Sequence, residues 1–449
     1  MADEGEKIKS FQSMTLDLPP SCIEFCPSHP SYFLVGTYNL EKNEAEQKNA
    51  ASDEDEDEDE AQAKQIQSKS GSIIVFELKD GQAHLKQTIA QPSAVFDLHF
   101  APQADRGDIC ATVSNTGTIS FFRLTPASSE STEDSLKGDL LQSLGVLSIP
   151  RLSEGDQFTS FTWHPVTPGL MAVTTSSGKV ILARVQDDYK HLRRLRTILR
   201  HDAEAWCVAF SPISHQAAGS EETLSTVFSG GDDSKLLLAT HGTRPDATDA
   251  MNSISEADSA PATEPDAKSD IDSSSESDEA LVPPQNARGI RHEAGVTAIL
   301  PLRLTTSDGH CVVVTGSYSD HLAAWGIVPP YKADGLRRNQ LLQDKNLGGG
   351  VWRLKLIEEL SDFAQDCWAV TLLVSCMHAG ARIVRLRAGT SGAVDRIEVV
   401  KRFEEHNSMN YGSDYAWVDG GEFFGEVEGR KIVCVSTSFY DRLLCLWTF

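Results

Sequence analysis

The sequence has no apolar run near the roughly 20 residues that a membrane-spanning helix needs. Bases are scarce: 40 Lys and Arg stand against 65 Asp and Glu, a formal net charge of −25, which argues against binding nucleic acid through its phosphates. The opening residues, MADEGEKIKS, lack the apolar stretch of a secretory signal. The nine cysteines form no Cys-x-x-Cys pair, which indicates buried, reduced thiols. We therefore expect a soluble cytoplasmic protein that binds neither membranes nor nucleic acids.

The common catalytic motifs are missing too. The sequence contains no Gly-x-Ser-x-Gly elbow, no His-Glu-x-x-His and no phosphate-binding P-loop. Its 13 histidines do not have the spacing typical of zinc ligands. Gly348-Gly-Gly-Val-Trp-Arg353 is glycine-rich, but it leads into a predicted strand and so indicates a tight turn. We expect no metal and no cofactor.

The negative charge is concentrated in two stretches, residues 41–64 and 244–288. Together they hold 22 acids and 6 bases, so that the rest of the chain, with 43 acids and 34 bases, has a net charge of only −9. A run such as Asp53–Glu60 repels itself and has nothing to bury. We predict disordered acidic inserts at 41–70 and 243–289, which are solvated loops or, alternatively, interaction segments.

Outside these inserts the apolar runs are short and rich in β-branched residues. Ser72–Leu78, Thr118–Leu124 and Lys179–Val185 have the length of strands, and helical periodicity is scarce. The sequence therefore predicts an all-β protein.

A repeated unit predicts how these strands are arranged. Four copies begin with a strand that ends in aromatic-x-Pro: Phe25-Cys-Pro27, Phe100-Ala-Pro102, Trp163-His-Pro165 and Phe210-Ser-Pro212. Three more, near residues 292–327, 348–386 and 406–449, keep only the later strands. Without the inserts the spacing is roughly the 40–50 residues of a WD40 blade. We predict that residues 1–449 form one seven-bladed WD40-type β-propeller.

Polar residues recur at the positions that pin such blades. His201, His292 and His406 precede the blades, Trp325 and Trp447 lie on third strands, and Ala239 replaces the tryptophan expected in blade 4. Acids occupy the turns between second and third strands, at Asp232-Asp233, Asp320 and Asp441. Ile8–Leu18 can pair as the outer strand of the last blade, which would leave no gap in the ring.

Five stretches resemble a known family: His201-Asp-Ala-Glu-Ala-Trp206, Ser229-Gly-Gly-Asp-Asp-Ser-Lys-Leu236, Thr315–Trp325, Gly348–Arg353 and Thr437–Trp447. In this order they are similar to the diphthine methylesterases, WD-repeat proteins of diphthamide biosynthesis. The resemblance covers residues 16–449 apart from the inserts. It departs from the family at Ala239 and at Ser319, where an acid is expected.

The resemblance implies a carboxylic ester hydrolase. Its substrate would be the translocating elongation factor carrying methylated diphthine, a modified histidine with a trimethylammonio group and a methyl ester. Hydrolysis would release methanol and leave diphthine for amidation. The alternative is a non-catalytic WD40 scaffold for protein assembly or trafficking, and either would act as a monomer.

Ester hydrolysis needs a base and oxyanion donors. We expect His201 or His292 to act as a base toward water, oriented by Asp232, because the loops that carry them meet at one face of the ring. The alternative for each histidine is a purely structural, blade-pinning network.

A quaternary ammonium binds over aromatic faces. The expected substrate-binding residues share a place in or beside the loops of that face: Trp206, Tyr318, Trp352, His378, Tyr411, Tyr440 and Asp441. For each aromatic residue the alternative role is core packing.

Overall fold

The structure is a computed structural model, and the residues that it describes are 5–40, 69–126, 139–153, 155–217, 219, 221–243, 289–332, 338–362, 367–389, 394–419 and 430–449. Almost all of the predicted inserts, 41–70 and 243–289, lie outside these residues. Among the described residues, no helix has the length and apolarity to cross a membrane.

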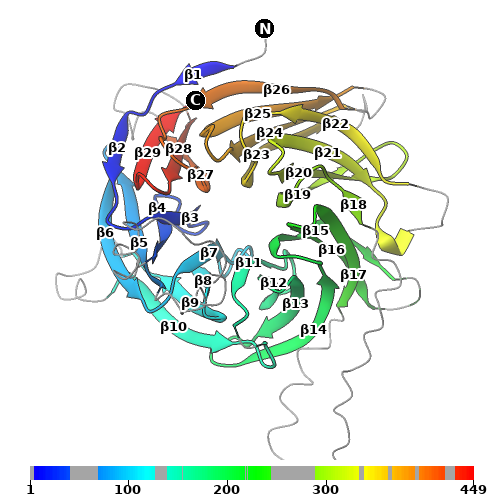
Figure 1. Cartoon of the computed structure of the whole chain (residues 1–449), viewed down its shortest axis with the longest axis horizontal. Coiled ribbons are helices and arrows are strands. Elements are labelled where there is room, and N and C mark those ends of the chain that lie inside the picture. Colours follow the sequence, from blue (N-terminus) through cyan, green and yellow to red (C-terminus); the bar gives the residue numbers. More distant parts are fainter. Residues whose placement is uncertain are drawn as a thin grey trace, which may run out of the picture.

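Seven sheets, each with at least four antiparallel strands, surround a central opening (Figure 1), which confirms the predicted seven-bladed propeller. Each blade contributes one inner strand to this opening. The inner strands of blades 1 to 7 are β3 (Pro20–Phe25), β7 (Val95–Phe100), β11 (Phe158–Trp163), β15 (Ala205–Gln216), β19 (Val296–Thr305), β23 (Arg353–Asp362) and β27 (Gly412–Asp419).

The other strands follow outward in chain order. The second strands are β4 (Tyr32–Leu40), β8 (Ile109–Ser114), β12 (Leu170–Thr175), β16 (Thr223–Gly231), β20 (Cys311–Ser317), β24 (Cys367–Ser375) and β28 (Arg430–Ser438). The third strands are β5 (Lys69–Lys79), β9 (Thr118–Leu124), β13 (Lys179–Val185), β17 (Lys235–Thr243), β21 (His321–Ile327), β25 (Ala381–Ala388) and β29 (Leu443–Thr448). The outer strands of blades 1 to 6 are β6 (Gln82–Gln91), β10 (Leu141–Ser148), β14 (Leu192–Arg200), β18 (Ile290–Arg291), β22 (Gln340–Asn346) and β26 (Val394–Phe403).

The N-terminal segment spans two blades. β2 (Gln12–Thr15) pairs antiparallel with β29 and supplies the fourth strand of blade 7. β1 (Glu6–Ile8) pairs parallel with β26 and gives blade 6 a fifth strand. The N-terminal chain therefore covers the outer edges of the last two blades (Figure 1).

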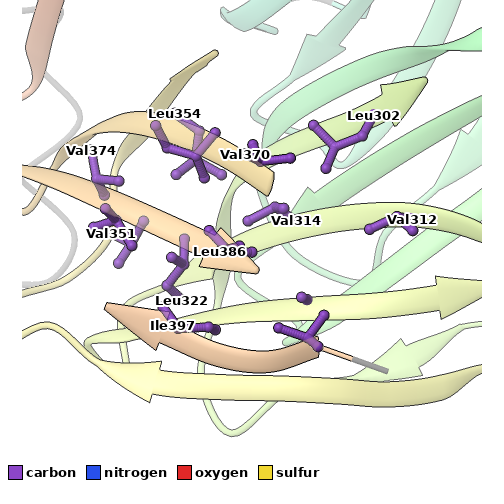
Figure 2. Close-up of a cluster of buried hydrophobic side chains, with 14 of the residues drawn as sticks. Leu302, Val312, Val314, Leu322, Val351, Leu354, Val370, Val374, Leu386 and Ile397 are labelled. Atoms are coloured by element: carbon purple, nitrogen blue, oxygen red, sulfur yellow. The ribbon is translucent and has the colours of Figure 1, made fainter. Parts of the chain in front are cut away.

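Apolar side chains between neighbouring blades form the core. Figure 2 shows the cluster between blades 5 and 6, which contains Val312 and Val314 of β20 together with Leu354 of β23 and Val370 of β24. The second and third strands of each blade are covered on both faces, so they are continuous apolar runs rather than alternating ones. Burying each of these valines and leucines stabilises the fold by roughly 1.5–3 kcal/mol.

Candidate functional site

A cavity of about 540 Å³ occupies the central opening. Its walls are the inner strands of six successive blades: β3, which contributes Ser21, and β7, β11, β15, β19 and β23. Inner strands run in the same direction, so the residues at their starts gather at one face of the ring and those at their ends at the other. The cavity extends along the strands, from Trp206 at the start of β15 to Phe210 and Pro212 further along it.

Four aromatic side chains lie together at the face where the inner strands begin. The Trp352 ring centroid is 5.8 Å from that of Trp206, 6.1 Å from that of Tyr318 and 4.9 Å from that of Tyr411. All four residues line the cavity. We call these four residues the aromatic cage. Each of them is a predicted substrate contact, and the structure brings the four together.

Three further aromatic residues, which sequence reasoning missed, continue this cluster around the opening. Phe439 lies 5.6 Å from Tyr411 and 4.7 Å from Tyr38, and Tyr38 lies 5.5 Å from Phe96. Tyr38 lies two residues before the end of the second strand β4, Phe439 directly follows the second strand β28, and Phe96 is at the start of β7. Their sequence contexts resemble ordinary strand packing, so only ring closure reveals their proximity.

The glycine run before β23 holds Trp352 in place. Gly348 has a φ of +84°, which favours glycine. A Cβ on Gly349 would lie 2.4 Å from the carbonyl oxygen of Cys376, so this segment passes directly against the turn of blade 6. The backbone of this run therefore packs closely against blade 6, and this contact fixes the positions of Trp352 and of the start of β23.

His201 sits within blade 4 rather than in the cavity wall. Its Nδ1 lies 2.8 Å from Asp233 Oδ1 and its Nε2 3.0 Å from Ser229 Oγ, whose hydroxyl is 3.0 Å from the Cys207 carbonyl oxygen. Both ring nitrogens are thus occupied, and the side chain is buried. This geometry favours the structural alternative for His201, with Asp233 and not Asp232 as its partner.

His292 and His406 occupy equivalent places in blades 5 and 7. His292 Nε2 lies 2.9 Å from Thr315 Oγ1, which also accepts a hydrogen bond from the Trp325 indole. His406 Nε2 lies 2.8 Å from Ser436 Oγ, which accepts the Trp447 indole N–H. Neither histidine lines the cavity. The expectation of a catalytic base at His201 or His292 therefore finds no support in their placement.

Asp232 lies at the edge of the aromatic cage. A Cβ on Gly295 would lie 2.9 Å from Asp232 Oδ1 and 3.0 Å from Tyr318 Cδ2, so the carboxylate and the Tyr318 ring flank this glycine. Burial and the Asp232 charge together raise the pKa of Tyr318. No described residue donates a hydrogen bond to the Asp232 carboxylate, which is exposed and available to a ligand.

The other three predicted residues lie beside the opening without lining the cavity. His378 is exposed and directly follows Met377, which does line it. Tyr440 is 70% exposed against Phe439. Asp441 accepts hydrogen bonds from the Ser408 hydroxyl at 2.6 Å and the Asn407 amide at 3.0 Å, which hold the loop leading into blade 7. Tyr440 and His378 can reach a large substrate, whereas Asp441 is already engaged.

Six ionisable side chains deeper in the opening were not predicted at all. They form three carboxylates and three bases on inner strands: Glu24, Asp97, His99, Arg353, Lys355 and Asp414. We call this set the cross-channel ion cluster. Arg353 of blade 6 donates to Asp97 of blade 2 at 2.8 Å, and Lys355 donates to Glu24 of blade 1 at 2.8 Å. The cluster thus links blades on opposite sides of the opening.

His99 is charged within this cluster. Its Nδ1 lies 2.7 Å from Glu24 and its Nε2 3.2 Å from Asp97. Burial alone would lower the pKa of His99, but the two carboxylates outweigh it and raise the pKa to about 9. Lys355 and His99 in turn overcome burial and lower the pKa of Glu24 to about 2. Burial raises the pKa of the third carboxyl group, Asp414, and the Lys355 charge opposes that shift.

Folding stability should therefore fall as pH rises through His99 titration. The folded pKa near 9 exceeds the unfolded value of about 6.5, so the stabilisation is complete below pH ~6.5 and is lost as the pH passes 9. We expect the free energy of unfolding in urea to decline by at most about 3 kcal/mol over this window. His99→Gln should flatten the decline, and an unchanged slope in that variant would contradict the assignment.

Within the described ranges, no three His, Cys, Asp or Glu side chains gather at a spacing that could hold a metal ion. All nine cysteines are free, and eight of them are buried.

Comparison with known proteins finds relatives that match most of this chain. No family model matches the chain. A Dictyostelium discoideum protein named diphthine methyltransferase homolog is 24% identical over 461 residues, covering 96% of this chain and 97% of that protein. The mouse protein named diphthine methyltransferase is 23% identical over 424 residues, covering 92% of this chain and 70% of its own length.

Among solved structures, Chaetomium thermophilum Sqt1, bound to the N-terminus of ribosomal protein L10, matches with a TM-score of 0.51. The two chains are 11% identical and the match covers 99% of this chain and all of the other. At that identity, the match shows a shared propeller fold and nothing further.

Proposed function

We propose that this chain, related over most of its length to proteins named diphthine methyltransferase, acts in diphthamide biosynthesis as a methylesterase. Its substrate is the methyl ester of methylated diphthine on the translocating elongation factor. Water adds to the ester carbonyl, the bond from the carbonyl carbon to the methoxy oxygen breaks, and methanol and a carboxylate leave with one proton released. No methyl donor is consumed.

The aromatic cage is the observation that supports this proposal. The substrate carries a trimethylammonio group, and such cations bind over tryptophan and tyrosine faces with about 0.5–2 kcal/mol per contact. Four such faces line one end of a 540 Å³ cavity, which has room for a modified side chain but not for a folded domain. The elongation factor would therefore insert its modified histidine through this face of the ring.

Asp232 is our proposed general base. It is the one catalytic candidate of the sequence analysis whose side chain has no hydrogen-bond donor among the described residues, and it flanks Tyr318 of the cage. A cation held in the cage would place the attached ester beside this carboxylate, which can take a proton from the attacking water. Its negative charge would also attract the trimethylammonio group.

Methanol release from elongation factor bearing the verified methyl ester, in buffer without any methyl donor, tests the proposal. Wild-type protein should release one methanol per ester, and the factor should lose one CH2 group in mass. Asp232→Asn should lower kcat by about 100-fold or more, as expected for loss of a general base. Asp202→Asn is the matched control, because Asp202 is an exposed carboxylate of the same blade that pairs with Lys235.

Two other outcomes would overturn the proposal. A gain of one CH2 group that depends on an added methyl donor would make the chain a methyl transferase in the sense of its relatives' name. Binding of the factor without turnover, under conditions where the ester is intact, would favour the non-catalytic scaffold.

A further inference from the structure

Two N–H donors are buried in the wall of the cavity without a hydrogen-bond acceptor. They are Nε1 of Trp206 and Nε of Arg353, and none of the described residues accepts from either. Native structures rarely leave such donors unpaired, because burial removes water without replacing it. Trp368 Nε1 and Arg184 Nε are also unpaired, but neither of those residues lines the cavity.

The Arg353 side chain is held in one orientation. Its Nη2 donates to Asp97 at 2.8 Å, and Asp97 is in turn fixed by the Ser160 hydroxyl at 2.7 Å and by His99. Burial opposes the charge of Arg353, but Asp97 more than compensates and raises its pKa, so the guanidinium stays protonated. Arg353 Nη2 thus donates its hydrogen bond within the ion cluster, whereas Arg353 Nε has no acceptor among the described residues.

Trp206 lines the same cavity from β15, which is separated from β23 by the inner strand β19. Its ring lies 5.8 Å from that of Trp352, the residue directly before Arg353. Cys207, the next residue of β15, lines the same cavity as Arg353. Trp206 and Arg353 therefore both line the cavity, and Trp206 belongs to the cage that we assign to the cation.

We propose that these two donors bind the carboxyl oxygen of a ligand whose trimethylammonio group occupies the aromatic cage. The inference rests on the proposed function and specifies how the ester is held. When water adds to the ester, the carbonyl oxygen becomes an oxyanion that accepts hydrogen bonds from Trp206 Nε1 and Arg353 Nε. As the methoxide leaves with a proton, the same donors hold the product carboxylate.

Trp206→Phe and Arg353→Lys separate this role from cation binding. The first keeps an aromatic face and the second keeps a charge beside Asp97, but each removes one of the two N–H groups. Loss of one oxyanion donor typically lowers kcat by about 100-fold or more, and we expect that loss for methanol release. Trp368→Phe, which removes an equally unpaired indole outside the cavity, should keep the wild-type rate.

A binding measurement gives a readout that needs no turnover. Glycine betaine carries a trimethylammonio group and a carboxylate, whereas tetramethylammonium has only the cation. We expect wild-type protein to bind glycine betaine at least about tenfold more tightly by calorimetry, and Trp206→Phe to lose that preference while still binding tetramethylammonium.

Equal affinity of wild-type protein for the two ligands would overturn the inference, as would an undiminished preference in Trp206→Phe. If Arg353→Lys does not fold, the rate of methanol release and the betaine preference of Trp206→Phe alone test the inference. A betaine preference without methanol release would reject the proposed reaction and keep the two-donor site, so the two failures are distinguishable.

Discussion

Asp97→Ala should lower the free energy of unfolding by about 3–5 kcal/mol, the usual cost of leaving a buried charge without its partner. Asp97 is 1% exposed and receives hydrogen bonds from Arg353 and Ser160 on two other blades. Its removal leaves the Arg353 guanidinium and the His99 imidazolium without their shared counter-charge. Urea unfolding followed by tryptophan fluorescence measures the effect.

Asp105→Ala is the matched control, because Asp105 is an exposed aspartate whose ion pair with Arg106 is at the surface, and such pairs contribute about 0–1 kcal/mol. The double variant Asp97→Ala/Arg353→Met should recover part of the loss, since removing both charges ends the imbalance. Equal unfolding midpoints for Asp97→Ala and Asp105→Ala would show that the cross-channel ion cluster does not tie the blades together.

Trp352→Ala should weaken binding of quaternary ammonium ions by about 10- to 30-fold. Trp352 is the central ring of the cage, in contact with three other aromatic side chains, and the loss corresponds to about 1.4–2 kcal/mol of cation–π interaction. Calorimetric titration with tetramethylammonium measures the dissociation constant directly. The KM for the methylated elongation factor should rise in parallel.

Trp352→Phe should retain most of the affinity, because an aromatic face remains. Trp417→Ala is the control: this tryptophan is 40% exposed, lies beneath Arg430 and does not line the cavity. If Trp352→Ala folds and binds tetramethylammonium as tightly as Trp417→Ala does, the aromatic cage is not the binding site for the quaternary ammonium group.

The repeated strand units, four of which carry aromatic-x-Pro, were enough to predict the propeller, because each blade is a local unit whose strands pair with their chain neighbours. The same locality explains why the His–hydroxyl–Trp networks of blades 5 and 7 could be anticipated: each is made within one blade. Blade 4 has Ala239 in place of the tryptophan, and there the Ser229 hydroxyl instead lies within hydrogen-bond reach of the Cys207 carbonyl oxygen.

The cross-channel ion cluster could not be predicted, because its partners are far apart in the chain. Arg353 and Asp97 are separated by 256 residues, and Lys355 and Glu24 by 331. In the sequence each is a single charged residue alternating with apolar ones, which is equally typical of a solvent-facing strand position. Only ring closure turns the inner face of these strands into a shared interior. The two unpaired donors of Trp206 and Arg353 are hidden for the same reason.

The way the first strands join the ring also sets the order of assembly during synthesis. Residues 6–15 are translated before all the blades, whereas the strands that they pair with, Val394–Phe403 and Leu443–Thr448, belong to blades 6 and 7. Blades 1 to 5 can form on the nascent chain while this segment waits unpaired, exposed to chaperones or to unintended strand partners. The ring therefore cannot close until blades 6 and 7 have been translated.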